Sequence, residues 1–254
     1  MDNKINRKGQ AVIFVIVALF IVVAVVFVFV SVRRPSFESR FGFDPESSIS
    51  QCVRKSANEL VDKMIAQGGF ASPSDSVVYN GINVTYVCKN INYYDPCIAQ
   101  YPAFIKTLAS EVKANIQNDV ENCLESLENE LGARNYEFSR DPTDLAIKLR
   151  LGIVEIKIDT NLSIRKESNA QSFKSFKVNV NTPLYDLAGV AQEIIKQETQ
   201  FCYFSTDGFS LLYNEFDVRR DVLSDSTKIY SIKDKNTGKT MNVAIRGCVI
   251  PAGF

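Results

Sequence analysis

The chain contains no histidine, and this absence restricts the chemistry open to it. Ser–His–Asp and Cys–His nucleophiles, histidine acid–base catalysis and many metal sites all need an imidazole. Carboxylate pairs, Ser–Lys pairs and oxygen sites for hard cations stay open, but nothing in the sequence marks a nucleophile elbow or a phosphate-binding loop. We therefore predict that the protein is not an enzyme, with no catalytic, cofactor-binding or metal-binding residues.

The chain also lacks an excess of either charge. It has no internal repeats and no low-complexity segments. The chain has 29 basic and 29 acidic residues. Residues 1–34 hold five of the bases and one of the acids, which leaves 24 bases, 28 acids and a balance of −4 in the remaining 220 residues. No broad basic surface is implied, so a nucleic-acid partner is not expected.

A long apolar run lies near the N-terminus. Residues Ala11 to Val32 contain one polar side chain, Ser31, and a helix over them is about 33 Å long at about 1.5 Å per residue. Arg33-Arg34-Pro35 follows the run in place of the small-residue cleavage site of a secretory signal. We predict a transmembrane helix over residues 10–34, which makes the lipid bilayer a partner.

All six cysteines lie beyond this run, an even number that is compatible with three disulfides and an extracytoplasmic domain. The alternative is six reduced thiols in a cytosolic domain. Bases flank both ends of the run, so charge alone barely decides its orientation. Cysteine usage leads us to expect the N-terminus in the cytoplasm and the C-terminal domain outside the cell. The cysteines are Cys52, Cys88, Cys97, Cys123, Cys202 and Cys248.

The outer domain is expected to begin at about Asp44, after a connector over residues 35–43. Asp44-Pro45 is typical of a helix start and opens an apolar stripe that ends at Gly68. Asn80-Gly81 suits both left-handed positions of a type I′ turn and predicts a hairpin. A second long helix is predicted from Pro102 to Leu131.

From Leu145 onward the apolar period changes from 3.6 to 2, which predicts strands. The remaining predicted elements are strands around Gly152, a strand over Phe176–Val180, a helix from Thr182-Pro183 to Phe201, and a hairpin over Ile229–Lys233 and Met241–Ile245. The predicted fold class is α+β, with an N-terminal transmembrane helix, then two long helices and a mainly antiparallel sheet with one inserted helix. The predicted domains are a leader (1–9), the transmembrane helix (10–34), the connector (35–43) and the outer domain (44–254).

The sequence alone leaves the cysteine connectivity open, although helix positions favour one pairing. Cys52 lies about one and a half turns after the start of the first helix, and Cys123 about two turns before the end of the second. Antiparallel packing would bring these thiols to one level. We favour Cys52 with Cys123, a local loop between Cys88 and Cys97, and by elimination Cys202 with Cys248.

The segment Arg7-Lys8-Gly9-Gln10, set directly before the apolar run, resembles the class III leader of archaeal type IV pilin-like proteins. The resemblance covers about the first 32 residues and implies that a prepilin-type peptidase cuts after Gly9 and leaves Gln10 as the new N-terminus. Phe14 stands where many pilins carry a glutamate, and Pro35 should break a helix that in many pilins continues into the head. An uncleaved anchor is the alternative.

Two further motifs concern the surface. Asn83 and Asn161 begin Asn-X-Ser/Thr sequons and are candidate glycosylation sites. Asp217, Asp221 and Asp225 are spaced by four, but they lack the alternation and central glycine of a calcium loop. We interpret them as a solvated charged segment.

These observations together predict a membrane-anchored cell-surface structural or interaction protein, most specifically a pilin-like subunit that associates with itself through the apolar helix. The alternative is a surface receptor or adhesin that does not polymerise. A third hypothesis is a membrane-tethered hydrolase, which needs convergent polar groups in a deep pocket.

Overall fold

A computed structural model describes residues 17–25, 44–167 and 169–249 of the chain. By its internal contacts the chain divides into two units, residues 1–44 and 45–254. In the first unit, residues 17–25 form a helix whose side chains are exposed.

The predicted transmembrane helix over residues 10–34 is not supported. None of the helices in the described ranges is both long and apolar enough to cross a membrane. Within the predicted span, residues 17–25 are described and form a helix. The rest of the predicted span lies outside the described residues.

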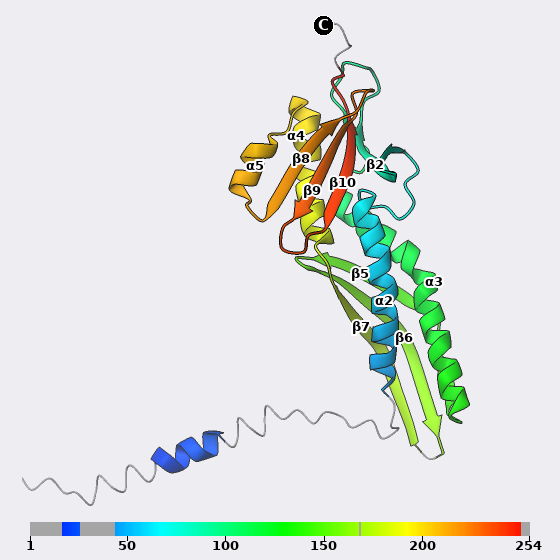
Figure 1. The fold of residues 1–254 in the computed structure, drawn as a ribbon. Helices are drawn as coiled ribbons and strands as arrows, with labels where there is room; N and C mark the ends of the chain where they lie inside the picture. Colours follow the sequence, from blue (N-terminus) through cyan, green and yellow to red (C-terminus); the bar gives the residue numbers. More distant parts are fainter. Residues whose placement is uncertain (1–16, 26–43, 168, 250–254) are drawn as a thin grey trace, which may run out of the picture. The chain divides into compact units, whose positions relative to one another are not determined.

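In the second unit, two helices cover one face of an antiparallel sheet (Figure 1). Strand β6 pairs with β7 along one side and with β5 and then β4 along the other. The even-numbered residues of β6 from Val154 to Ile164 are buried, and the odd-numbered ones are not, as period-2 patterning requires when one face is packed. The elements are α2 (Pro45–Ala66), α3 (Phe104–Ala133), β4 (Glu137–Arg140), β5 (Asp144–Arg150), β6 (Ile153–Lys166) and β7 (Asn169–Asn181).

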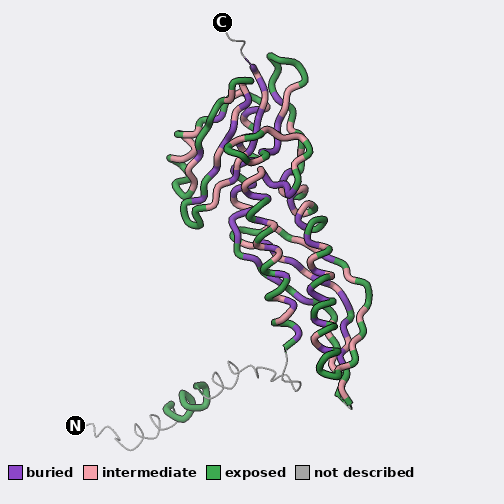
Figure 2. The backbone as a smooth tube through the Cα atoms, turned by 45° about the vertical axis from the view of Figure 1, so that its right-hand side comes forward, coloured by how far each residue is buried: buried purple, intermediate pink, exposed green. Residues whose placement is uncertain are grey.

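A second sheet has the strand order β1-β2-β10-β9-β8, with β3 paired to β2. The central strands β2 and β10 are parallel, although they are far apart in the sequence. The other strand pairs are antiparallel. Figure 2 shows the buried residues running through the strands of both sheets and along one side of the helices. The strands are β1 (Ser76–Tyr79), β2 (Ile82–Lys89), β3 (Ile98–Ala99), β8 (Phe216–Val222), β9 (Lys228–Asp234) and β10 (Thr240–Arg246).

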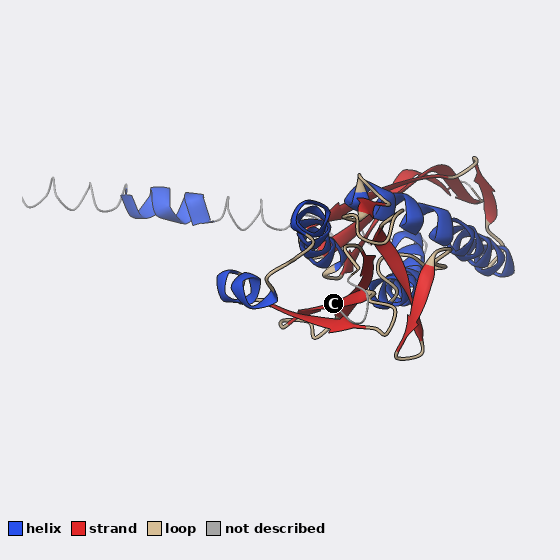
Figure 3. Cartoon of the chain, turned by 90° about the horizontal axis from the view of Figure 1, so that it is seen from above, coloured by secondary structure: helices blue, strands red, loops and turns tan. Residues whose placement is uncertain are grey.

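Helix α4 (Leu184–Phe201) packs against both sheets and α3, whereas α5 (Thr206–Leu212) contacts β8. The apolar face of α4 is buried, at Leu187, Ala191 and Ile194 among others. None of the residues of α5 is buried. Seen from above, α5 is a short helix at the periphery of the unit (Figure 3).

The predicted arrangement of the outer domain is therefore wrong in two respects. Residues 45–249, where described, contain four helices rather than two long helices and one insert, and their strands form two sheets rather than one. Helix α5 was not predicted because it has only seven residues and none of them is buried. A helix of this kind has no apolar period in its sequence. Strand β8 was interpreted as a solvated charged segment because Arg219, Arg220 and Asp221 mask its alternation.

Candidate binding groove

A groove of about 1080 Å³ lies on the second unit, where α4, α5 and two turns meet. One turn is Leu151-Gly152, between β5 and β6, and the other follows β9 at residues 234–237. We call this feature the groove and define it by its lining: Leu151, Gly152, Asn181, Thr182, Pro183, Tyr185, Asp186, Gly189, Val190, Glu193, Gln197, Ser205, Gly208, Phe209, Leu212, Tyr213, Glu215, Phe216, Asp234, Asn236 and Thr237.

One stripe of α4 forms the floor of the groove. Tyr185, Gly189, Glu193 and Gln197 recur every four residues, so they share one face of the helix. A Cβ atom added at Gly189 meets nothing within 4 Å. The middle of the floor is therefore open at a position where most helices carry a side chain.

Helix α5 supplies an apolar wall. The Ser205 hydroxyl accepts a hydrogen bond from the Gly208 N–H and caps the helix. The Phe209 ring packs between Phe204 and Tyr213, with ring centroids 5.4 and 4.6 Å away. Leu212, which also lines the groove, is 82% exposed, so the apolar wall is not covered by the rest of the unit.

Hydrogen bonds hold the two turns at the rim. The Gly152 N–H donates to the Asp186 carboxylate at 2.9 Å, and the Gly152 carbonyl accepts from the Thr182 N–H at 2.9 Å. In the other turn, the Asp234 carboxylate accepts from the backbone N–H groups of Asn236 and Thr237. Both turns are therefore fixed by carboxylates that also line the groove.

The charge of the groove is of one sign. Its lining includes four carboxylates and, among the residues described, no lysine or arginine. The Lys196 ammonium lies 3.9 Å from the Glu193 carboxylate in an exposed ion pair. Such a pair is weak, so it neutralises the charge of Glu193 only partly. The four carboxylates are Asp186, Glu193, Glu215 and Asp234.

One buried hydroxyl in the groove lacks a partner. Thr182 lines the groove and is 4% exposed, and its Oγ1 has no hydrogen-bond partner within the part of the chain that the structure describes. A buried polar atom without a partner lowers the stability of the fold at this position.

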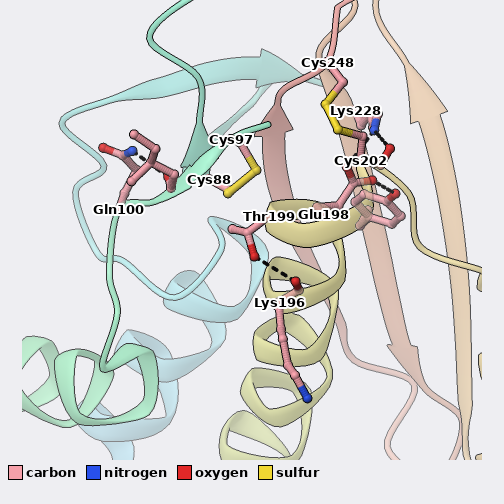
Figure 4. The surroundings of a disulfide bond; sticks show 11 residues. Cys88, Cys97, Gln100, Lys196, Glu198, Thr199, Cys202, Lys228 and Cys248 are labelled. Atoms are coloured by element: carbon pink, nitrogen blue, oxygen red, sulfur yellow. Dashed lines mark hydrogen bonds and ion pairs between the residues drawn. A yellow bond between two sulfur atoms is a disulfide. The ribbon is translucent and has the colours of Figure 1, made fainter. Parts of the chain in front are cut away.

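A buried polar cluster lies at the C-terminal end of α4, beside the Cys202–Cys248 disulfide (Figure 4). The side chain of Glu198 is fully buried and accepts hydrogen bonds from the Tyr230 hydroxyl and, at 2.6 Å, from Lys228. Lys228 also donates to the Cys202 carbonyl. Burial, and then the Glu198 carboxylate, raise the pKa of Tyr230 far above its usual range. None of these residues lines the groove.

The cysteines predicted to pair are joined in three disulfides: Cys52–Cys123, Cys88–Cys97 and Cys202–Cys248. The first links α2 to α3, and the other two lie near each other at the end of α4 (Figure 4). This is the pairing that the sequence favoured.

The two predicted glycosylation sites do not line the groove. Asn83 and Asn161 are exposed, and the Asn161 amide donates to Asp141. Gly9 and Gln10 lie outside the described residues.

The three spaced aspartates serve different parts of the fold. Asp221 on β8 accepts from the Tyr79 hydroxyl, Asp217 pairs with Arg219, and Asp225 accepts from the Thr227 N–H and hydroxyl in a turn. Within the described ranges, no group of three or more acidic or cysteine side chains is placed to hold a metal ion.

Sequence reasoning missed the groove entirely, because its lining comes from segments between residues 151 and 237 that meet only in the folded unit. The one available signal was Gly189 in the middle of an otherwise regular helical pattern. Comparison of the chain with protein-family models, curated proteins and solved structures found no match.

Proposed function

We propose that this chain is a cell-surface interaction protein that works outside the cytoplasm and binds a partner in the groove. The observation that carries the proposal is an open groove lined by apolar side chains that face solvent, with Leu212 82% and Leu151 77% exposed. Clustered exposed apolar side chains with a polar rim mark interaction sites more often than chance surface features.

The disulfides support the location. Three disulfides account for all six cysteines, and such bonds persist in oxidising compartments outside the cytoplasm. A surface receptor or adhesin is the form of this function that the groove favours, because the groove offers a ready site for a second molecule.

A pilin-like filament subunit is the second candidate, and the segment Arg7-Lys8-Gly9-Gln10 is what favours it. In that case the partners are a prepilin-type peptidase and further copies of the chain. Sequencing of the mature N-terminus distinguishes the two candidates: a chain that begins at Gln10, together with filaments in sheared surface material, supports the subunit.

A hydrolase has less support. Two of the four carboxylates in the groove, Asp186 and Asp234, are engaged by backbone N–H groups of the rim, and the described lining has no lysine that would pair with a serine. The hydroxyl of its Ser205 is engaged as a helix cap. We therefore propose binding rather than catalysis.

Two measurements on the full chain test the proposal. On intact cells, added protease should cleave the protein, and alkylation without reductant should label none of the six cysteines. Protection from protease together with six labelled thiols would overturn the location.

The binding role is tested with a matched pair of glycine variants. Gly189 lines the groove and Gly132 lies in α3 away from it, and a Cβ added at either residue meets nothing within 4 Å. Purified Gly189→Leu protein should lose binding to intact cells, whereas Gly132→Leu protein should bind like the wild type. Equal binding by all three proteins would show that the groove is not the site.

A further inference from the structure

We propose that the groove takes a basic peptide segment that carries an aromatic or aliphatic anchor, an inference that rests on the proposed interaction function. The juxtaposition behind it is an apolar wall and four carboxylates that line the same groove.

The charge of the groove selects the charge of the ligand. Four carboxylates converge on one surface with no lining cation among the described residues, so an approaching lysine or arginine is attracted and an acidic or phosphorylated ligand is repelled. Glu193 and Glu215 are well suited to this role, because neither carboxylate holds a turn of the rim as Asp186 and Asp234 do.

The apolar lining selects the anchor. Tyr185, Phe209 and Leu212 come from two helices and face one space. Aromatic and aliphatic anchors in such a space supply much of the affinity of protein interfaces, while charges at the rim set specificity and association rate.

The dimensions favour a peptide over a small molecule. A volume of about 1080 Å³ is slightly above the range of ordinary small-molecule sites, which span about 300–1000 Å³. The stripe from Tyr185 to Gln197 is about 18 Å long at about 1.5 Å per residue, enough for about five residues of an extended chain.

The test uses labelled peptides of about eight residues, the span of the floor plus a margin, with the oxidised full chain. One peptide has lysines and phenylalanines, a second has glutamate for each lysine, and a third has serine for each phenylalanine. Fluorescence anisotropy should show the first peptide binding at least about tenfold more tightly than either of the others, with affinity falling as salt is raised.

Charge reversal in the protein gives the sharper result. Glu193→Lys/Glu215→Lys protein should bind the lysine peptide about tenfold more weakly and the glutamate peptide more tightly. Glu128→Lys, at an exposed position of α3 outside the groove, should leave both affinities unchanged. Gly189→Leu should abolish binding of the lysine peptide.

The other outcomes separate this inference from the proposed function. If all three peptides bind equally and Gly189→Leu blocks them all, the ligand class is wrong and the groove remains a binding site. If no peptide binds while Gly189→Leu still abolishes binding to cells, the peptide inference alone fails. If the lysine peptide binds and neither Gly189→Leu nor the charge reversal changes its affinity, the groove is not the site and both proposals fail.

Discussion

The backbone N–H of Gly152 donates a 2.9 Å hydrogen bond to the carboxylate of Asp186, joining a turn of the first sheet to the first turn of α4. The Thr182 N–H donates a hydrogen bond of the same length to the Gly152 carbonyl. Gly152 has φ +69°, a conformation that glycine adopts without steric strain. This pair of bonds sets one rim of the groove against its floor.

Replacement of Asp186 by alanine should lower the free energy of unfolding by about 1–2 kcal/mol. One hydrogen bond contributes about 0.5–1.5 kcal/mol, and a carboxylate in the first turn of a helix adds about 0.3–1 kcal/mol. Asp186→Asn keeps an acceptor and should lose less. Urea unfolding of the wild type, Asp186→Asn and Asp186→Ala should give free energies of unfolding that fall in this order. Equal stability of Asp186→Ala and the wild type would show that the rim does not depend on this hydrogen bond.

Gly189→Ala should stabilise the protein and impair binding in the groove. Glycine inside a helix costs about 0.5–1 kcal/mol relative to alanine, and an added Cβ here meets nothing within 4 Å. The expected result is a gain of that size in thermal or urea unfolding, together with weaker peptide binding. A loss of stability would mean that the position is constrained by the fold rather than kept open for a ligand.

Removal of the Lys228 ammonium should be strongly destabilising. Lys228→Met leaves the buried Glu198 carboxylate without its cation, and breaking one side of a buried ion pair costs about 3–5 kcal/mol. Lys196→Met, which breaks the exposed pair with Glu193, should cost about 0–1 kcal/mol. Denaturant midpoints compare the two variants, and similar losses in both would contradict the buried cluster.

Alkaline pH should destabilise the protein through Tyr230. In the unfolded chain the phenol ionises with the ordinary tyrosine pKa of about 10, whereas burial and Glu198 raise the pKa in the folded protein. The contribution of the protonated Tyr230 to the free energy of unfolding is therefore complete below about pH 10. It is lost as the pH rises above this value, because the unfolded state releases the tyrosine proton while the folded state still holds it.

Unfolding measured at several pH values around 10 should show a steeper decline for the wild type than for Tyr230→Phe. Some slope should remain in the variant, because the Asp221 hydrogen bond raises the pKa of Tyr79 and burial raises that of Tyr101. Identical slopes in the two proteins would exclude Tyr230 as the source.

The disulfides should differ in their contribution to stability. Cys52–Cys123 closes a separation of 71 residues and Cys88–Cys97 one of 9. The chain-entropy relation assigns about 4 kcal/mol to the long loop and about 2.5 kcal/mol to the short one. Double alanine variants, unfolded without reductant, test the order, and a larger loss from the short loop would favour strain or packing over loop entropy.

Local chemistry in the sequence was enough to predict several elements. Asn80-Gly81 predicted a hairpin, and both residues have the positive φ angles of its turn, +50° and +79°, between β1 and β2. Helical periodicity placed Cys52 and Cys123 at one level, and the structure joins them. Such predictions succeed because they depend on neighbours within a few turns of the chain.

The arrangement of the outer domain shows where local patterns fail. Period-2 patterning identified strands but could not assign them to two sheets, because partner choice depends on residues far apart in the chain. The parallel pairing of β2 with β10 is of this kind.

The sequence by itself determined most of the helices and strands with a clear apolar period, which thiols are available to pair, and that the chain has no histidine. Only the tertiary structure decided that Leu151, Asp186, Leu212 and Asp234 border one groove, since each belongs to a different segment. The physical reason is that side-chain period and turn preference are local properties. A concave surface instead arises from long-range packing, which no single segment encodes.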